Sequence, residues 1–154
     1  MDRAAPTDLL LAVDHVGIAV ADLDEAIGFY RRTFGLECVH QEVNEEQGVR
    51  EAMLAVGGSD TRLQLLAPLT PESTIAGFLD RSGPGVQQVA YRVADVQHVS
   101  GVLRGRGLRL LYDEPRAGTA GSLVNFVHPR DAGGVLVELV QPAGAGPEPV
   151  GTAD

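Results

Sequence analysis

The chain of 154 residues has little of several features that mark whole classes of protein. It contains one cysteine, Cys38, which excludes a disulfide framework and a cysteine-based metal site. Its formal net charge is −9, so no overall positive field is available to bind the phosphates of nucleic acid. Its longest apolar runs have only the length of a strand, so no membrane span is expected. Residues 1–6 lack the charged start and apolar stretch of a secretory signal, and we therefore expect a cytoplasmic protein.

The chain does contain enough apolar sequence to form a folded domain. Hydrophobic residues make up 44% and charged residues 21% of it, as is ordinary for globular proteins. This length suits one domain, or two small modules that share a core. We expect a tail over residues 1–8, a single domain over residues 9–142 and a disordered tail, rich in Gly, Pro and Ala, over residues 143–154.

An internal repeat divides this domain into two modules. Residues 13–22 read VDHVGIAVAD, and residues 86–95 repeat the pattern as VQQVAYRVAD, 73 residues later. The segment LQLLAP at residues 63–68 is matched by VELVQP at residues 137–142. A repeat at so nearly constant an offset indicates that one structural unit occurs twice. Module one spans residues 9–68, and module two spans residues 86–142.

Each module is predicted to form a strand, a helix and three further strands. In module one, Asp22 and Glu25 form a capping box at the start of the helix, and apolar residues spaced by three and four continue it. Predicted strands cover residues 9–20, 37–43, 49–56 and 62–67, with the helix over residues 23–33. In module two, strands cover residues 86–93, 108–112, 123–127 and 135–140, with a helix over residues 96–106 and a glycine-rich loop over residues 116–121. A linker with a short helix occupies residues 69–85, and the fold class is α+β.

Six runs of sequence carry a resemblance to a known family. They are DHVGIA (14–19), EVNEEQGVREAML (42–54), LQLLAP (63–68), LLYDEPR (110–116), NFVHP (125–129) and GVLVELVQ (134–141). These runs resemble the vicinal oxygen chelate superfamily of glyoxalases, bleomycin-resistance proteins and dioxygenases, and within it the methylmalonyl-CoA epimerases. The resemblance implies that the two βαβββ modules form one curved, cup-shaped mixed sheet.

The resemblance also implies a divalent metal ion inside the cup. Its four ligand positions fall on His15, Gln64, Gln88 and Glu138 in this sequence. The family has histidine where this chain has Gln88, and an amide oxygen binds borderline metals more weakly than an imidazole does. We therefore expect metal to bind, but more loosely. Octahedral coordination suits cobalt first, and manganese, nickel or magnesium next, better than tetrahedral zinc.

Each of these residues has a simpler interpretation when it is taken alone. A histidine in an apolar strand, such as His15, is more often a core residue, and a single glutamine commonly faces water. Glu138 is harder to explain in this way, because a carboxylate between apolar neighbours is costly to bury without a partner. Four polar residues at equivalent positions of two modules favour a site.

The reaction implied by the resemblance is the interconversion of (R)- and (S)-methylmalonyl-CoA through a metal-stabilised enolate. Glu51 takes the place of the family's general base, and Glu138, or a water beside it, serves the opposite face. Without the resemblance, Glu51 together with Glu45 and Glu46 suggests a solvated acidic edge.

Three further residues are candidates for holding a substrate carboxylate. Arg116 and Ser122 belong to a glycine-rich stretch whose backbone N–H groups can bind anions, and Asn125 follows it. Such a stretch is equally often an ordinary flexible connection.

Two other functions stay open on this sequence. One is a small-molecule-binding protein of the resistance type with a weakened metal site, which Gln88 favours. The other is an enzyme of secondary metabolism that acts on another acyl-thioester. A ring-cleaving dioxygenase is disfavoured, because its iron usually takes two histidines and one carboxylate. Family members commonly pair, and an exposed sheet edge would favour a homodimer.

Overall fold

The computed structural model describes residues 8–144. Most of the two predicted tails, residues 1–7 and 145–154, lies outside the described residues. Module one contains β1 (Ala12–Ala19), α1 (Leu23–Phe34), β2 (Glu37–Asn44), β3 (Val49–Ala55) and β4 (Arg62–Pro68), and α2 (Thr74–Ser82) follows it. Module two contains β5 (Gly85–Arg92), α3 (Val96–Gly105), β6 (Arg116–Ala117), η2 (Thr119–Gly121), β7 (Leu123–Val127), η3 (Pro129–Asp131) and β8 (Leu136–Gln141).

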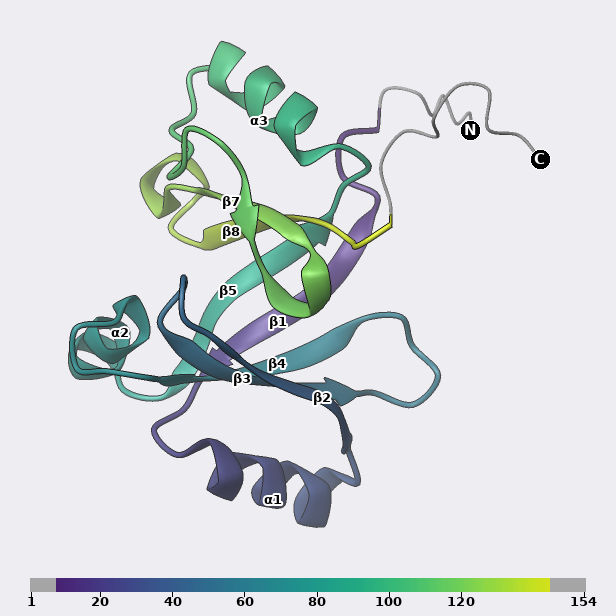
Figure 1. Ribbon diagram of the computed structural model, residues 1–154, viewed down its shortest axis with the longest axis vertical. Helices are drawn as coiled ribbons and strands as arrows, with labels where there is room; N and C mark the ends of the chain where they lie inside the picture. The colour runs from purple at the N-terminus through teal and green to yellow at the C-terminus, as the bar shows by residue number, and fades with distance from the viewer. Residues whose placement is uncertain (1–7, 145–154) are drawn as a thin grey trace.

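The two modules share one eight-stranded mixed sheet in the order β2-β3-β4-β1-β5-β8-β7-β6. The first strands of the modules, β1 and β5, pair antiparallel at its centre, and each pairs parallel with the last strand of its own module. In Figure 1 the two halves of the sheet curve around this central pair. This curved sheet confirms the predicted fold class of two tandem modules.

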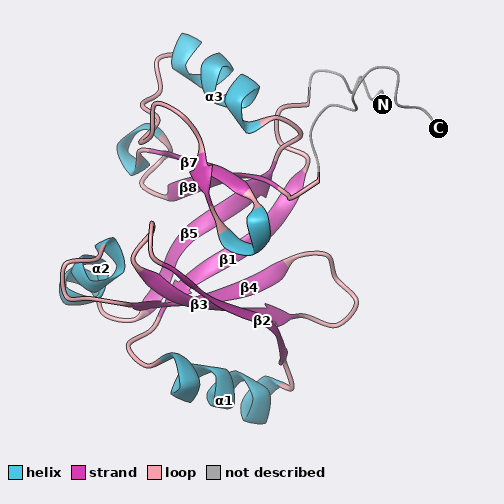
Figure 2. Ribbon diagram, in the orientation of Figure 1, coloured by secondary structure: helices cyan, strands magenta, loops and turns pink. Residues whose placement is uncertain are grey.

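Helices α1 and α3 cover the outside of the two halves, as Figure 2 shows. The two helices have equivalent N-caps, as the internal repeat predicts. Asp22 accepts a hydrogen bond from the backbone N–H of Glu25, and Asp95 accepts one from the backbone N–H of His98. Each helix buries its apolar side against its own half of the sheet. Two of the four core clusters of the described residues form there: Leu23 of α1 packs with Leu54 and Leu65, and Val96 of α3 packs with Val127 and Leu139. These helices and their two clusters therefore lie outside the curved sheet. On the inner face, polar residues lie among the apolar residues of two further clusters, such as Leu66 and Phe126.

The strand predicted over residues 108–112 was wrong. Only Leu110 makes a ladder bridge, to Val127, and the short strand β6 forms later in the chain. The physical reason lies in Asn125, whose side-chain amide bonds both the N–H and the C=O of Tyr112. Arg109 and Leu111 keep backbone bonds to the chain around β7, and the Asn125 side chain takes the place of a backbone partner at Tyr112.

Within residues 8–144, we find no helix with the length and apolar character needed to cross a membrane.

Candidate active site

A cavity of about 100 Å³ lies on the inner face of the sheet, between the two modules. Four of the predicted site residues line it: Glu51 from β3, Gln64 from β4, Gln88 from β5 and Glu138 from β8. His15, from β1, contacts Glu138. These five side chains are all buried, and none is more than 6% exposed. The curvature of one sheet thus gathers residues that are as many as 123 positions apart.

A continuous network of hydrogen bonds joins these five side chains. The His15 Nε2 lies 3.1 Å from Glu138 Oε1, which also accepts a bond of 2.5 Å from the Gln88 amide. The same amide nitrogen reaches Gln64 Oε1 at 3.4 Å. The Gln64 amide in turn donates to Glu51 Oε1 at 2.6 Å. The predicted ligand positions and the predicted base therefore meet in one place.

Gln88 reaches this network because Gly17 has no side chain. Gly17 is its cross-strand neighbour on β1, and a Cβ at position 17 would lie 2.6 Å from Gln88 Cγ. Any larger residue there would displace the glutamine from the network.

Glu51 is a buried carboxylate whose two oxygens differ. Its Oε1 accepts hydrogen bonds, whereas its Oε2 is buried with no hydrogen-bond partner. Burial raises the pKa of Glu51 to about 7, against the lowering effect of the Thr119 hydroxyl, and the nearby carboxylates Glu42 and Glu138 raise the pKa further. A solvated acidic edge is excluded for this residue, because it is only 2% exposed. A carboxylate with this pKa can accept a proton near neutral pH and release it again.

Thr119 is a site residue that the sequence pattern did not reveal. Its hydroxyl donates to Glu51 Oε1 at 2.7 Å and accepts from the Gln64 amide at 3.0 Å. It lies 68 positions from Glu51, inside the glycine-rich loop for which the sequence suggests either anion binding or a flexible connection. No local signal in the sequence links the two residues, because only the closure of the cup brings them together.

Asp14 and Arg92 support His15 from outside the network. Asp14 lies 2.7 Å from His15 Nδ1 and accepts a bond of 2.9 Å from Arg92. Burial alone would lower the pKa of His15, but the hydrogen bonds to Asp14 and Glu138 outweigh it and raise the pKa to about 9. A carboxylate on Nδ1 directs Nε2 into the site, as around many metal-binding histidines.

The residues present fit a divalent cation. Within residues 8–144 there is no metal-binding group of three or more His, Cys, Asp and Glu side chains, so the two glutamines have to complete the set. One imidazole nitrogen, one carboxylate and two amides then converge, a combination that suits borderline and hard divalent ions. The glutamine nitrogens donate to carboxylates here, and a half-turn of each amide would present its oxygen instead.

Unpaired polar atoms mark the cavity as a place for a ligand. Among the described residues, the buried side-chain atoms without a hydrogen-bond partner are Gln47 Nε2, Glu51 Oε2 and Gln87 Oε1. All three residues line this same cavity. Because buried polar atoms are nearly always paired in folded proteins, a polar ligand that fills the cavity is the natural source of the missing partners.

The three predicted substrate residues lie in different places. The Arg116 guanidinium stacks over the ring of Tyr112, which lines the cavity, with 4.1 Å between guanidinium carbon and ring centroid. Ser122 is buried and faces a second cavity of about 310 Å³ that borders His15 and Glu138. Asn125 does not line either cavity and is fully buried, and its amide is used on the backbone of Tyr112. The structure therefore gives Asn125 a structural contact and leaves it away from the site.

Comparison with known proteins places this geometry in a family. The model of the Glyoxalase/Bleomycin resistance protein/Dioxygenase superfamily matches residues 14–126. An ethylmalonyl-CoA/methylmalonyl-CoA epimerase of Cereibacter sphaeroides is 37% identical over 131 residues, covering 84% of this chain and 96% of that protein. The chain belongs to the methylmalonyl-CoA epimerase family of this superfamily.

Solved structures of methylmalonyl-CoA epimerases share the fold. The crystal structure of the enzyme from Mycobacterium tuberculosis has a TM-score of 0.86 at 56% identity, covering 89% of this chain and 91% of that chain. A methylmalonyl-CoA epimerase in complex with methylmalonyl-CoA and NH4+ has a TM-score of 0.85 at 46% identity, covering 91% of this chain and all of that chain. The likeness to this family extends over both modules.

Proposed function

We propose that this protein is an isomerase that interconverts (R)- and (S)-methylmalonyl-CoA by moving the proton at C2. The observation that carries the proposal is Glu51, a buried carboxylate with one unpaired oxygen in the cavity of an epimerase-family fold. The relatives named as methylmalonyl-CoA epimerases, one of them in complex with methylmalonyl-CoA, support this substrate.

Each module supplies one acid–base group for the proposed proton transfer. Glu51 Oε2 accepts the C2 proton from one face of the substrate, since Oε1 is already occupied by two donors. Loss of this proton makes C2 planar, so inversion needs a donor on the other face. Glu138, or a water beside it, is proposed for that face, because it lines the cavity from module two whereas Glu51 lines it from module one.

His15, Gln64, Gln88 and Glu138 would hold a divalent metal ion, and cobalt is the proposed ion. A cation held there would supply positive charge beside the thioester oxygen and so lower the energy of the enolate. The chain's own part is to shield the site from water, since these four side chains are nearly fully buried. The neighbour named with NH4+ supports a cation in this family's fold.

The proposed setting of the protein follows from its family and its sequence. We propose a cytoplasmic homodimer in which residues 9–142 form the single domain. Ethylmalonyl-CoA is proposed as a second substrate, because the relative from Cereibacter sphaeroides is named for both acyl groups.

Isotope exchange tests this function directly. Purified protein with cobalt is incubated with methylmalonyl-CoA in deuterated solvent, and incorporation at C2 is followed by mass spectrometry. Exchange well above a control without enzyme supports the proposal, and ethylmalonyl-CoA serves as the second arm. Exchange no faster than the control for both substrates rejects the epimerase function in favour of a binding protein of the same fold.

A further inference from the structure

Residues 118–122, here called the strap, connect β6 to β7 and separate the two cavities. Thr119 lines both of them, the cavity with Glu51 on one side and the cavity with His15 on the other. Figure 2 shows η2, which lies within the strap, projecting from module two toward β2 of module one. The strap is therefore the place where module two reaches the catalytic side of module one.

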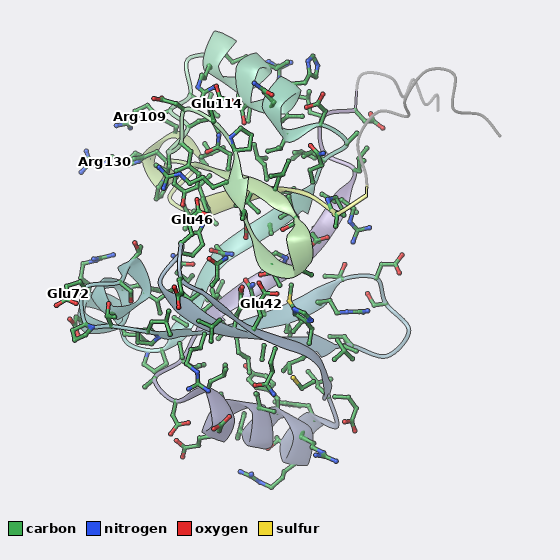
Figure 3. The ribbon with its side chains drawn as sticks, viewed as in Figure 1. Glu42, Glu46, Glu72, Arg109, Glu114 and Arg130 are labelled. Carbon is green, nitrogen blue, oxygen red and sulfur yellow. The ribbon has the colours of Figure 1, made fainter. Side chains whose placement is uncertain are left out.

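Glu42 ties the strap to module one. It lies on β2, directly opposite Glu51 in the register with β3, and Figure 3 labels it at the centre of the molecule. Its Oε1 accepts a hydrogen bond of 3.0 Å from the backbone N–H of Ala120 and one of 2.6 Å from His40. The Glu42 side chain is 27% exposed, so these bonds are only partly open to competition from water.

The strap contains a strained backbone conformation, which a hydrogen bond such as that from Ala120 to Glu42 helps to hold. Ala120 has φ 56° and ψ 39°, the left-handed region that a residue with a Cβ adopts only at a cost. Conformations of this kind persist where the surroundings hold them, and they gather at functional sites. Gly118 allows the strap to pack closely on Val124 and Ser122, because a Cβ at position 118 would lie 2.6 Å from Val124 and 2.7 Å from the Ser122 hydroxyl.

The residue beside Ala120 is Thr119, which holds the proposed base. Its hydroxyl and the Gln64 amide both occupy Oε1 of Glu51. Oε2 is the oxygen left without a partner. The strap, through Thr119, thus acts together with Gln64 to occupy one carboxylate oxygen of Glu51 and leave the other unpaired.

We propose that Glu42 is a positioning residue: it clasps the strap through Ala120, so that Thr119 fixes Oε1 of Glu51 and leaves Oε2 to take the proton. This inference rests on the proposed function for its effect on turnover, but the clasp itself is a contact that can be tested without any substrate. The clasp needs an acceptor oxygen at position 42 rather than a charge, because Ala120 donates an uncharged N–H. The charge of Glu42 acts separately, by raising the pKa of Glu51.

The test compares Glu42→Ala, which removes the acceptor, with Glu42→Gln, which keeps an oxygen in the same place. Glu42→Ala should lower kcat about tenfold and change KM less than about twofold, because substrate contacts are untouched while the base is misaligned. Glu42→Gln should restore most of the activity. Glu45→Ala, an exposed glutamate in the turn after β2, is the matched control and should behave as the wild type.

Two further measurements separate positioning from general damage. Hydrogen–deuterium exchange of a peptide over residues 118–122 should become faster in Glu42→Ala and stay unchanged in Glu42→Gln. Glu42→Ala should also cost little further activity when Thr119→Val has already removed the hydroxyl, because both changes break the same path. The proposal would be contradicted if hydrogen–deuterium exchange of the strap were unchanged in Glu42→Ala. It would also be contradicted if the losses of activity of Glu42→Ala and Thr119→Val simply added in the double variant. If the wild type fails to exchange the C2 proton of the substrate, the proposed function is rejected. Hydrogen–deuterium exchange of the strap then still tests whether Glu42 holds the strap.

Discussion

The amide of Gln88 donates to the amide oxygen of Gln64 at 3.4 Å, and this contact joins the two modules at the base of the cavity. Each glutamine also holds one carboxylate: Gln64 holds Glu51, and Gln88 holds Glu138. Gln64 both donates and accepts, and Gln88 donates to two acceptors, so the two amides keep two buried carboxylates apart within one network. This arrangement gives each carboxylate a fixed place before any ligand arrives.

Replacement of Glu51 by glutamine should lower turnover by roughly 10² or more, because the amide cannot accept the C2 proton. The substitution keeps the size of the side chain and an oxygen for Thr119, so metal uptake should stay as in the wild type. Initial rates of C2 exchange measure the loss of turnover, and calorimetric titration with cobalt measures the metal uptake. Glu45→Gln is the control, and a near-normal rate in Glu51→Gln would place the base elsewhere.

Replacement of Gln88 by histidine should tighten binding of cobalt about tenfold or more, which corresponds to about 1.4 kcal/mol. An imidazole is the stronger ligand, and Gly17 leaves the space through which the side chain at position 88 reaches the site. Titration calorimetry measures the change. Gln87→His places the same ring on the neighbouring residue, which also lines the cavity, and should give no comparable gain. Equal affinity in Gln88→His and the wild type would show that position 88 is not a ligand.

Replacement of Glu51 by glutamine should stabilise the metal-free protein at alkaline pH. Burial raises the pKa of Glu51 from 4.5 to about 7, so the folded state keeps a proton that the unfolded chain releases between these values. The free energy of unfolding of the wild type therefore falls as pH rises from about 4.5 to about 7, and the neutral amide removes this loss. The advantage of the variant should grow by about 2 kcal/mol between pH 5 and pH 8.5. Urea unfolding with a chelator present measures it, and a difference independent of pH would contradict the burial of an ionisable group at this position.

Replacement of Asn125 by leucine should destabilise the fold by about 2 to 4 kcal/mol. The side chain is fully buried and bonds both backbone groups of Tyr112. Its loss would leave the Tyr112 N–H unpaired, whereas the Tyr112 C=O keeps a bond from Arg104. Thermal or urea unfolding checks the loss. Ser100→Ala removes only one contact of the same amide, at 3.3 Å, and should cost less than about 1 kcal/mol. A leucine variant as stable as the wild type would contradict the structural role of Asn125 and favour a role in substrate binding.

The limits of prediction from this sequence are visible at Asn125 and Glu51. The run at residues 108–112 was predicted as a strand, yet its backbone pairing with β7 stops at Tyr112, where a single buried amide bonds the backbone instead. Residue type alone gave Glu51 no preference over its neighbours Glu45 and Glu46, and only the resemblance singled it out. In the structure Glu51 is buried, whereas the two others are exposed. Burial depends on which face of a strand meets the rest of the fold, and a pattern with several acidic residues does not show it.

The amino-acid sequence by itself determined the repeat, the two modules, the helix caps and four polar positions related by that repeat, because spacing and periodicity are local properties of the chain. Only the tertiary structure decided that Thr119 bonds Glu51, that Glu42 reaches Ala120, and that three unpaired polar atoms line one cavity. These contacts join residues from opposite modules or far apart in the chain. They exist because one sheet curves until its two halves face each other, and no local preference encodes that approach.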